Sequence, residues 1–431
     1  MLDIRYIREN PQKVQTAAES KGYSVDISHL LSLDENRREL QTKVEEVRRE
    51  RNELADGLKQ TKPTPEQITR GKALKTQVAE IEDRLRVVDE EFMTLLKKVP
   101  NMPLEDVPVG ASEDENVVVK TVGELPKFDF EPKNHWEIGQ ARGWIDKERA
   151  AKVAGSRFAY VMGDLARLHF AVLQFALDRL TDENVLQQIV TDNGLTASSK
   201  PFVPVLPPAM IRTEVYEATA RLNGEEQTYK LADDELWLNA SAEHSMSPMY
   251  QNEILDESQL PLRYLGYTTA FRREAGTYGK DMEGIFRLHQ FDKLEMESFT
   301  AAADSLQEHL FMVAVQEYLM QQLELPYQVV MKCTADIGGP NARGIDIDVW
   351  LPGQNMYRET HTADLITDYQ TRRLQTRVRH GDGTIELAHT NDATAFSQRP
   401  LIGIIENYQT ADARVRVPKV LQSYLGGKEI L

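Results

Sequence analysis

The sequence contains a single cysteine, Cys333, among its 431 residues. One cysteine excludes an internal disulfide bond and a zinc site built from several thiolates, and it suits a reducing compartment such as the cytoplasm. We expect Cys333 to be a small, buried, apolar side chain. Long apolar runs are also missing, since none approaches the roughly 20 residues that span a bilayer. The segment 1–22 carries Arg5, Arg8 and Glu9 instead of an apolar signal core, so we expect neither secretion nor membrane insertion.

Positive charge is scarce. The chain has 51 Lys and Arg against 68 Asp and Glu, and its formal net charge is −17. This balance argues against indiscriminate nucleic-acid binding and against a DNA partner, because a polyphosphate is repelled unless basic side chains gather in one place. The sequence also lacks a GxxxxGK[ST] loop and a GxGxxG turn after a strand, so any ATP site must be built differently. At this length, with 41% apolar residues, we expect two or three domains.

Two heptad seams stand near the start of the chain. Their apolar residues alternate at steps of four and three, which is typical of a coiled coil. One seam consists of Leu74, Val78, Ile81, Leu85, Val88, Phe92 and Leu95, and the other of Leu40, Val44, Val47, Leu54 and Leu58, with Arg51 at one apolar position. The segment 61–65 contains two prolines and breaks the helix between them. The pattern predicts an antiparallel hairpin at about 27–98, with arms roughly 40 Å long, on a small cap at 1–26.

Basic side chains gather around the tip of this hairpin. In the segment 59–75 five positive charges stand against one negative charge, Glu66, which gives +4. The five are Lys59, Lys62, Arg70, Lys72 and Lys75. We interpret them as a local phosphate-binding surface. The alternative is an arm for oligomerisation or for a protein partner, whose charges form only its solvated face.

The chain changes character after the arm. Residues 99–132 are rich in proline and in acidic residues, so we expect a linker at 106–132 between an N-terminal domain at 1–105 and a second domain at 133–431. In the second domain short apolar runs alternate with longer helical patterns. This alternation predicts an α+β fold around an antiparallel sheet.

The most informative stretch of the second domain is FRRE at 271–274, a glycine-rich loop at 275–284 and RLHQFDKLE at 287–295. The period of a β-strand places one set of side chains of the last segment on a common face. This set is Arg287, His289, Phe291, Lys293 and Glu295. A hairpin would add Arg272 and Glu274, and arginine suits phosphates while Phe291 can stack on a purine. The alternative is a surface hairpin with paired charges.

A second group is RPLIGIIENY at 399–408. Pro400 suits the first turn of a helix, and the spacing of the apolar residues after it is typical of a buried helix face. Arg399 then lies at the helix N-terminus, where an anion is stabilised. A lone arginine at this place is also compatible with a structural role.

These segments resemble the motifs of class II aminoacyl-tRNA synthetases in their seryl version. FRRE, the glycine-rich loop and RLHQFDKLE are similar to motif 2, Arg399 with its helix and ENYQ to motif 3, and the segment 207–211 (PPAMI) to motif 1, which forms the dimer interface in that family. The similarity runs almost end to end, through MLDIRYIRENP, the arm, KVPNMP, VPVG, ERAAKVAGSRF and the tail. It implies an antiparallel coiled-coil arm followed by a class II catalytic domain, an antiparallel sheet flanked by helices.

The resemblance implies a two-step, ATP-dependent ligase reaction. A carboxylate of the amino acid attacks the α-phosphate of ATP, and a terminal hydroxyl of tRNA then accepts the aminoacyl group from the adenylate. The nucleophile, with a pKa of about 3.5, is already ionised, so catalysis rests on positioning and charge stabilisation. The implied partners are serine or another small amino acid, a serine tRNA whose long variable arm is gripped by the coiled coil, and a second copy of the chain.

The family pattern also implies roles for individual residues. Arg272 and Arg399 would hold the phosphates as the catalytic pair, and Glu295 would receive the substrate ammonium. The implied ATP site consists of Arg272, Glu274, Arg287, Phe291, Glu359 and Arg399. The implied amino-acid site consists of Ser241, Glu243, Glu295, Asn391 and Ala393, and the Mg²⁺ ligands are Glu359 and Thr362.

The amino-acid pocket departs from the family. The family's Thr-x-Glu loop is Ser241-Ala-Glu243 here, and the serines after Glu359 are replaced by THTADL. Counting back from Arg399 without gaps places Ala393 where the family has a hydroxyl that contacts the substrate, whereas a shift of one residue would place Thr394 there. A site that binds a hydroxyl can favour it by about 10⁴ to 10⁵.

The sequence therefore leaves two alternatives to a seryl-tRNA synthetase. One is a paralogue that activates another small amino acid or loads another acceptor, and the other is a non-catalytic tRNA-binding protein. His289, His361 and His389 have no evident partners in the sequence, so we expect each to be structural.

Overall fold

The computed structural model describes residues 1–57, 62–222, 227–274 and 283–431. The chain forms two compact units, Met1–Met102 and Pro103–Leu431. Within the described residues no helix is both long and apolar enough to cross a membrane. Of the residues predicted to carry the site, Lys59 and most of the glycine-rich loop lie outside the described part of the chain, as does the seam residue Leu58.

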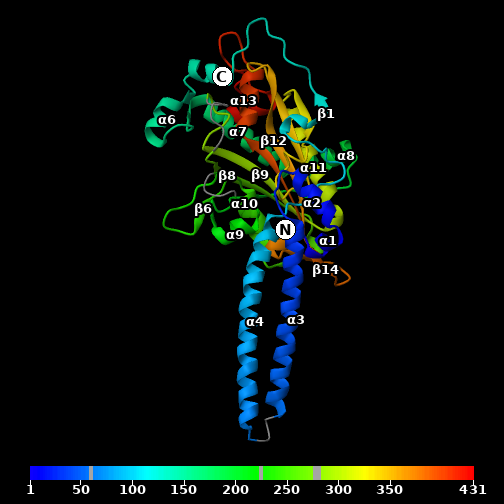
Figure 1. Cartoon of the computed structure of the whole chain (residues 1–431). Helices are drawn as coiled ribbons and strands as arrows, with labels where there is room; N and C mark the ends of the chain where they lie inside the picture. Colours follow the sequence, from blue (N-terminus) through cyan, green and yellow to red (C-terminus); the bar gives the residue numbers. More distant parts are fainter. Residues whose placement is uncertain (58–61, 223–226, 275–282) are drawn as a thin grey trace. The chain divides into compact units, whose positions relative to one another are not determined.

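The first unit is a small helical cap followed by a long helical hairpin. Its helices are α1 (Ile4–Glu9), α2 (Pro11–Ser20), α3 (Ile27–Gly57) and α4 (Pro65–Lys98). Pro11 stands at the first position of α2, as expected for a residue without a backbone N–H. Thr64 and Gln67 form a reciprocal capping box at the start of α4, so the chain restarts a helix directly after the turn. Figure 1 shows α3 and α4 side by side and antiparallel, which confirms the predicted hairpin.

The predicted heptad seam holds the two helices together. Val47, Leu74 and Val78 form a buried cluster, with Leu54 and Ile81 packed against it. Towards the end of α4 the seam continues through the buried Phe92 and Leu96, where the heptad pattern predicted Leu95. The apolar contact is therefore a narrow strip between two otherwise polar helices.

The second unit is built on an eight-stranded sheet with the order β1-β10-β11-β12-β15-β9-β8-β4. All neighbours are antiparallel except β4 and β8, so the α+β prediction is confirmed. The strands are β1 (Val117–Val122), β4 (Val203–Val205), β8 (Leu262–Phe271), β9 (Gln290–Thr300), β10 (Tyr327–Met331), β11 (Arg343–Leu351), β12 (Met356–Thr367) and β15 (His389–Ser397).

Helices cover one face of this sheet and form the main core with it. Those in contact with the central strands are α7 (Gly163–Leu180), α11 (Ser305–Gln322) and α13 (Gln398–Asn407). Met296, Ala363 and Ala393 lie opposite one another on three adjacent strands, and all three belong to the apolar core. Because side chains alternate along a strand, the neighbours of these residues point to the other face of the sheet, which is the face left for a ligand.

Smaller elements complete the second unit. The helices are α5 (His135–Ala141), α6 (Lys147–Ala154), α8 (Glu183–Asp192), α9 (Thr213–Ala218), α10 (Glu243–Met246) and α12 (Thr371–Leu374). The short strands are β2 (Ile145–Asp146), β3 (Tyr160–Val161), β5 (Met210–Arg212), β6 (Leu236–Leu238), β7 (Ile254–Asp256), β13 (Arg377–Arg379) and β14 (Ile385–Leu387).

The predicted linker at 106–132 is wrong. This segment contains β1, which pairs with β10 at the edge of the main sheet, and the second unit begins at Pro103. The physical reason is the valine-rich run at 117–122, whose strand propensity outweighs the acidic and proline-rich composition around it.

The segment before β1 also encloses the single thiol. Cys333 is completely buried, as expected, and a side chain at Gly110 would come within 2.8 Å of its Sγ atom. Only glycine allows this close approach, so the loop around Gly110 seals Cys333 inside the unit.

Candidate active site

The β8–β9 hairpin positions the first group of predicted site residues. Phe271 pairs with Gln290 at its open end, and the backbone N–H of Arg272 continues the ladder by donating to the carbonyl of His289 at 2.9 Å. The predicted hairpin is therefore confirmed. The predicted strand begins too early, however, since Arg287 precedes β9 and reaches the site from a non-strand segment.

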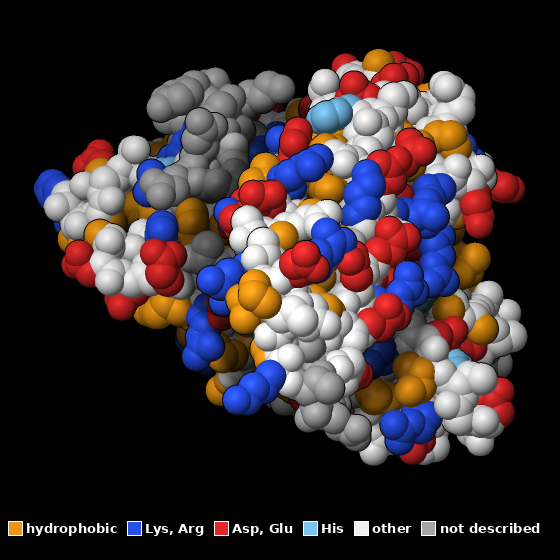
Figure 2. Space-filling model, turned by 60° about the horizontal axis from the view of Figure 1, so that its bottom comes forward, with side chains coloured by type: hydrophobic (Ala, Val, Ile, Leu, Met, Phe, Trp, Pro, Cys, Tyr) orange, Lys and Arg blue, Asp and Glu red, His pale blue; other side chains and the backbone are white. Residues whose placement is uncertain are grey.

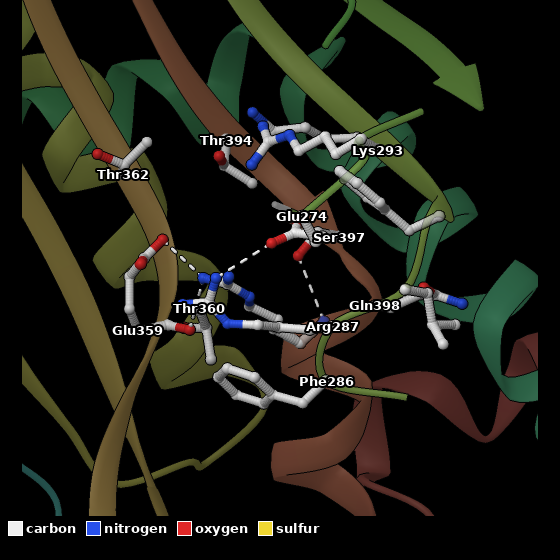
Figure 3. A pocket seen from close by; sticks show the side chains of 14 residues that line it. Glu274, Phe286, Arg287, Lys293, Glu359, Thr360, Thr362, Thr394, Ser397 and Gln398 are labelled. Carbon is white, nitrogen blue, oxygen red and sulfur yellow. Dashed lines mark hydrogen bonds and ion pairs between the residues drawn. The ribbon is translucent and has the colours of Figure 1, made fainter. Parts of the chain in front are cut away.

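A cavity at this end of the hairpin brings together all six residues of the implied ATP site. They are Arg272, Glu274, Arg287, Phe291, Glu359 and Arg399. Figure 3 shows side chains from β9, β12, β15 and the start of α13 converging on this space. Residues more than 100 positions apart in the chain thus meet at one place, which is what a surface hairpin with locally paired charges would not produce.

Two salt bridges fix the charged groups in this cavity. Arg287 Nη1 lies 3.1 Å from Glu274 Oε2, and Arg399 Nη1 lies 2.7 Å from Glu359 Oε1. Desolvation favours neutral Glu359, but the charges of Arg399 and Lys332 outweigh it and lower the pKa of this carboxyl to about 2. Glu359 is therefore an anion at any physiological pH.

Aromatic rings line the same space. The guanidinium of Arg272 lies 5.1 Å from the centre of the Phe291 ring, and that of Arg399 lies 4.8 Å from the centre of the Phe286 ring. These cation–π contacts orient the arginines and leave them close to flat apolar surfaces. Phe286 precedes the HQFDKLE motif, and no sequence pattern pointed to it.

Arg399 occupies the place predicted for it at the N-terminus of α13. Ser397 caps this helix by accepting a hydrogen bond from the Arg399 backbone N–H at 3.3 Å. The predicted buried face is present, since Leu401, Ile404 and Ile405 are at most 1% exposed. Packing of α13 therefore holds the arginine at the positive end of the helix dipole, beside the cavity.

A second cavity of about 350 Å³ adjoins the first. The two share Arg272, Glu274, Arg287, Lys293, Thr362 and Arg399 as lining residues. Ser241 and Glu243, predicted for the amino-acid site, line only the second cavity. The Ser241 hydroxyl accepts hydrogen bonds from the Glu243 backbone N–H at 3.3 Å and from Lys293 Nζ at 3.4 Å. The first cavity thus continues into a second, polar one.

Glu295 is placed differently from the prediction. It is completely buried in β9 and forms a salt bridge with Lys293, one of the residues that line both cavities. Burial raises the pKa of Glu295, while the Lys293 ammonium opposes this shift. In this conformation the Glu295 carboxylate is paired with Lys293 and does not line either cavity.

The prediction of Ala393 as a substrate contact is wrong. Ala393 faces the apolar core, whereas Thr394 lines the first cavity and Asp392 the second. Asn391 is completely buried two residues before Ala393, and alternation places it on the same side of β15, away from the cavities. The physical reason is a bulge between Thr394 and Phe396, which adds a residue to β15 and makes counting back from Arg399 fail by one.

Sequence reasoning missed part of the second cavity. Arg221, Asp364 and Asp392 line it together with Glu243. Asp364 stands inside the THTADL segment, and Asp392 directly precedes Ala393, so these two departures from the family were the available signal. Arg221 follows α9 in a segment without any motif and could be found only from the structure.

The metal-side residues lie on β12. Glu359 lines the first cavity and Thr362 lines both. In the described part of the chain, no three or more His, Cys, Asp and Glu side chains form a group that could hold a metal ion by themselves. Two further carboxyls are nearby on β11, because Asp346 pairs with Thr362 and Asp348 with Glu359 in the strand register.

The three histidines contact the scaffold, as expected. His289 Nδ1 lies 2.9 Å from the carbonyl of Arg272, and His389 Nδ1 lies 2.9 Å from the Ser305 hydroxyl. His361 is completely buried, and burial lowers its pKa to about 3. A neutral, buried imidazole of this kind is a packing group.

The predicted basic residues of the arm are exposed. They are Lys62, Arg70, Lys72 and Lys75. Arg70 forms a salt bridge with Glu50 across the hairpin, which offsets part of its charge. In Figure 2 basic and acidic side chains alternate over the face shown and do not separate into one large patch of either sign.

Two protein families match the chain. Residues 1–103 match the seryl-tRNA synthetase N-terminal domain. Residues 228–408 match the tRNA synthetase class II core domain (G, H, P, S and T). The first match covers the arm and the second covers the cavities.

Characterised proteins and solved structures are similar over the whole length. A serine–tRNA ligase of Thermodesulfovibrio yellowstonii is 39% identical, with 99% of each chain covered. One of Deinococcus radiodurans is also 39% identical, over 100% of this chain and 99% of the other. The crystal structure of seryl-tRNA synthetase from Pyrococcus horikoshii complexed with ATP superposes with a TM-score of 0.89 at 34% identity, covering 100% of this chain and 99% of that one. The cytoplasmic enzyme of Naegleria fowleri in complex with AMP gives a TM-score of 0.84 at 29% identity, over 100% and 98%.

Proposed function

This chain belongs to the seryl-tRNA synthetase family of class II aminoacyl-tRNA synthetases, and on that premise we propose that it activates serine with ATP and transfers it to a serine tRNA. The observation that carries the proposal is the convergence of six predicted ATP-site residues on one cavity that opens into a second, polar one. The non-catalytic alternative offers no physical reason for that convergence.

In the first step an oxygen of the serine carboxylate forms a bond to the α-phosphorus of ATP, and the bond from this phosphorus to the pyrophosphate oxygen breaks. The carboxylate is already ionised, so the chain needs no general base. Arg272 and Arg399 hold the negative charge that spreads over the phosphate oxygens, because both guanidiniums line the cavity and are fixed by their contacts with Phe291 and Phe286.

Phe291 stacks on the adenine, and Glu274 accepts a hydrogen bond from its exocyclic amine. Arg287 holds Glu274 in place through their 3.1 Å salt bridge, and its guanidinium, which lines the same cavity, contacts a terminal phosphate of ATP. Rigid positioning by the β8–β9 hairpin supplies the orientation on which a two-substrate reaction depends.

Glu359 and Thr362 fit a Mg²⁺ ion that is shared with ATP. Mg²⁺ takes oxygen ligands and is usually bound by one or two carboxylates together with substrate phosphates. Glu359 has a half-exposed carboxylate in the first cavity, and Thr362 has a hydroxyl on the same wall. An ion held there neutralises phosphate charge.

The serine occupies the second cavity, with its carboxylate towards the first. Ser241 and Glu243 contact its ammonium group, and Thr394, which lines the adjoining first cavity, supplies the hydroxyl that was predicted at Ala393. Glu295 acts through Lys293, either as its support or as an ammonium ligand once Lys293 turns towards the substrate.

Further partners follow from the arm and from β5. The basic residues of the hairpin contact the phosphates of the long variable arm of the tRNA. Met210 in the motif 1 segment is 49% exposed and Leu206, directly before that segment, is 84% exposed, and these apolar side chains suit burial against a second copy of the chain. The free thiol of Cys333 suits the reducing cytoplasm.

Amino-acid-dependent exchange of pyrophosphate into ATP tests the proposal. Serine should support exchange well above alanine, threonine, glycine and cysteine, and Arg272→Ala should lower the rate by about 10²-fold or more. Exchange with another amino acid would instead support the paralogue. If none of these amino acids supports exchange, only the alternative of a non-catalytic tRNA-binding protein remains.

A further inference from the structure

Arg221 lines the second cavity, but not the first, and contacts three carboxylates. Its Nε lies 2.6 Å from Glu243 Oε1, and its Nη2 lies 3.1 Å from Asp392 Oδ1 and 3.6 Å from Asp364 Oδ2. The three acids come from α10, β15 and β12. One guanidinium thus joins three separate elements of the fold around the space assigned to serine.

These charged groups are removed from water. The side chains of Glu243, Asp364 and Asp392 are 4 to 7% exposed, and that of Arg221 is 15% exposed. Buried carboxylates of this kind are costly unless they are paired. Desolvation and the nearby Glu243 raise the pKa of Asp392, and Arg221 opposes that shift. Arg221 therefore holds the Asp392 carboxyl in place through their 3.1 Å contact and partly offsets the cost of burying it.

The geometry of the two cavities assigns a direction to the substrate. Arg272 and Arg399 line both cavities, so the reacting carboxylate belongs at their boundary. Arg221, Asp364 and Asp392 line only the second cavity. The side chain of an amino acid whose carboxylate faces ATP must then point away from this boundary, towards the Arg221 end.

Along β15 the substrate meets Thr394 first and Asp392 next. The two residues share a face of the strand and lie about 7 Å apart, at 3.3 Å per residue. Charged side chains line this end of the cavity. The methyl group of alanine would therefore lie against polar groups or water and make no favourable contact there. This end suits a hydroxyl, which can donate to a carboxylate.

We propose that Arg221 is a positioning residue that fixes the Asp392 carboxylate to accept the hydrogen bond of the substrate hydroxyl, so that this pair discriminates serine from alanine and glycine. The inference rests on the proposed function, because it names the group that reads the side chain of the serine to be activated. Arg221 itself does not react, since it acts through the orientation of Asp392 and Glu243.

Pyrophosphate exchange with serine and with alanine, measured as the ratio of their kcat/KM values, tests the proposal. Asp392→Ala should lower this ratio by about 10- to 100-fold, the loss expected for a hydrogen bond to a charged group. The KM for serine should rise while the KM for ATP stays the same. Asp392→Asn should restore part of the ratio, because an amide oxygen still accepts a hydrogen bond. Arg221→Lys should also lower it, since lysine keeps the charge but loses the planar fork.

A matched control is a second buried arginine of the same unit. Arg263 donates from Nε and Nη2 to Glu308, each at 2.7 Å, and is 1% exposed. Arg263→Lys should lower the melting temperature as Arg221→Lys does and leave the serine-to-alanine ratio unchanged. The double variant Arg221→Lys/Asp392→Ala should lose no more selectivity than Asp392→Ala alone, because both changes remove the same interaction with the substrate hydroxyl.

Different failures have different meanings. An unchanged ratio in folded Asp392→Ala, or an equal loss of ratio in Arg263→Lys, would overturn the inference and leave the cluster as a structural link. If the unaltered protein shows no exchange with serine, the proposed function fails and the inference falls with it. If Asp392→Ala does not fold, Arg221→Lys and Asp392→Asn decide by the same ratio.

Discussion

Arg399 at the start of α13 donates to the carboxylate of Glu359 on β12 across 2.7 Å, although 40 residues separate them in the chain. The same guanidinium also donates to the backbone carbonyl of Glu359 at 3.2 Å. A helix N-terminus and a strand are thereby joined at the place where phosphates are expected, and one arginine links the ATP-binding and metal-side groups.

This pair makes a prediction about acid stability. The pKa of Glu359 is lowered from 4.5 to about 2, so its contribution to stability is complete above about pH 5 and is lost as the pH falls through 2. Glu359→Gln should therefore be less stable than the unaltered protein at pH 7, and the difference should shrink between pH 4.5 and 2. Thermal unfolding across this range measures it, with the exposed Glu131→Gln as control. A gap that stays constant with pH would contradict the prediction.

Asp348 predicts a dependence of the opposite sign. Burial and the charge of Glu359 raise its pKa from 3.8 to about 7. Ionising this carboxyl costs stability, and the cost appears as the pH rises from about 4 to 7. Asp348→Asn should raise the melting temperature at pH 8 by about 3 °C or more and change it little at pH 4. Stabilisation that is equal at both pH values would assign the effect to packing.

The β15 bulge predicts which residue carries the serine-site hydroxyl. Thr394→Val should lower kcat/KM for serine by about 10- to 100-fold in pyrophosphate exchange, because a hydroxyl that lines the cavity is lost. The matched change Ala393→Ser should leave serine activation unimproved and should destabilise the protein by about 1–3 kcal/mol, since it buries a hydroxyl in the apolar core. The reverse pattern would mean that the family count without a gap is right.

The arm predicts a separation of the two reaction steps. Lys72→Glu/Lys75→Glu should weaken tRNA serylation while the rate of pyrophosphate exchange stays the same. The slope of the logarithm of the tRNA-binding constant against the logarithm of salt concentration should fall by about two, one for each lost phosphate contact. Arg84→Glu/Arg86→Glu, two exposed residues on the same helix outside the basic segment, serves as control. If both pairs weaken tRNA binding equally, the tip has no special role.

The sequence predicts the elements whose signals are local. The α3–α4 hairpin follows from its heptads, and the β8–β9 hairpin follows from strand periodicity and from the motif between residues 271 and 295. The six residues predicted for the ATP site line one cavity, and five of them, all except Glu359, stand in the segments that resemble motifs 2 and 3. In such places short-range pattern and long-range packing agree.

The remaining features depend on backbone detail and on distant contacts. The bulge after Thr394 shifts the side-chain alternation, so Ala393 turns to the core and a count along the sequence is misled. β1 was not predicted, because the segment around it is rich in proline and acidic residues. Arg221 meets Asp364 and Asp392 only after three chain segments fold together, and no spacing in the sequence encodes that meeting.

The enclosure of Cys333 beneath the loop of Gly110 has a practical consequence. The protein has one thiol, and that thiol is completely buried. A cysteine introduced in place of the exposed Arg84, outside the basic segment of the arm, would then be the sole accessible target for a maleimide dye, with no need to replace the native residue first. A fluorophore attached there would report tRNA docking on the arm in an otherwise unaltered molecule.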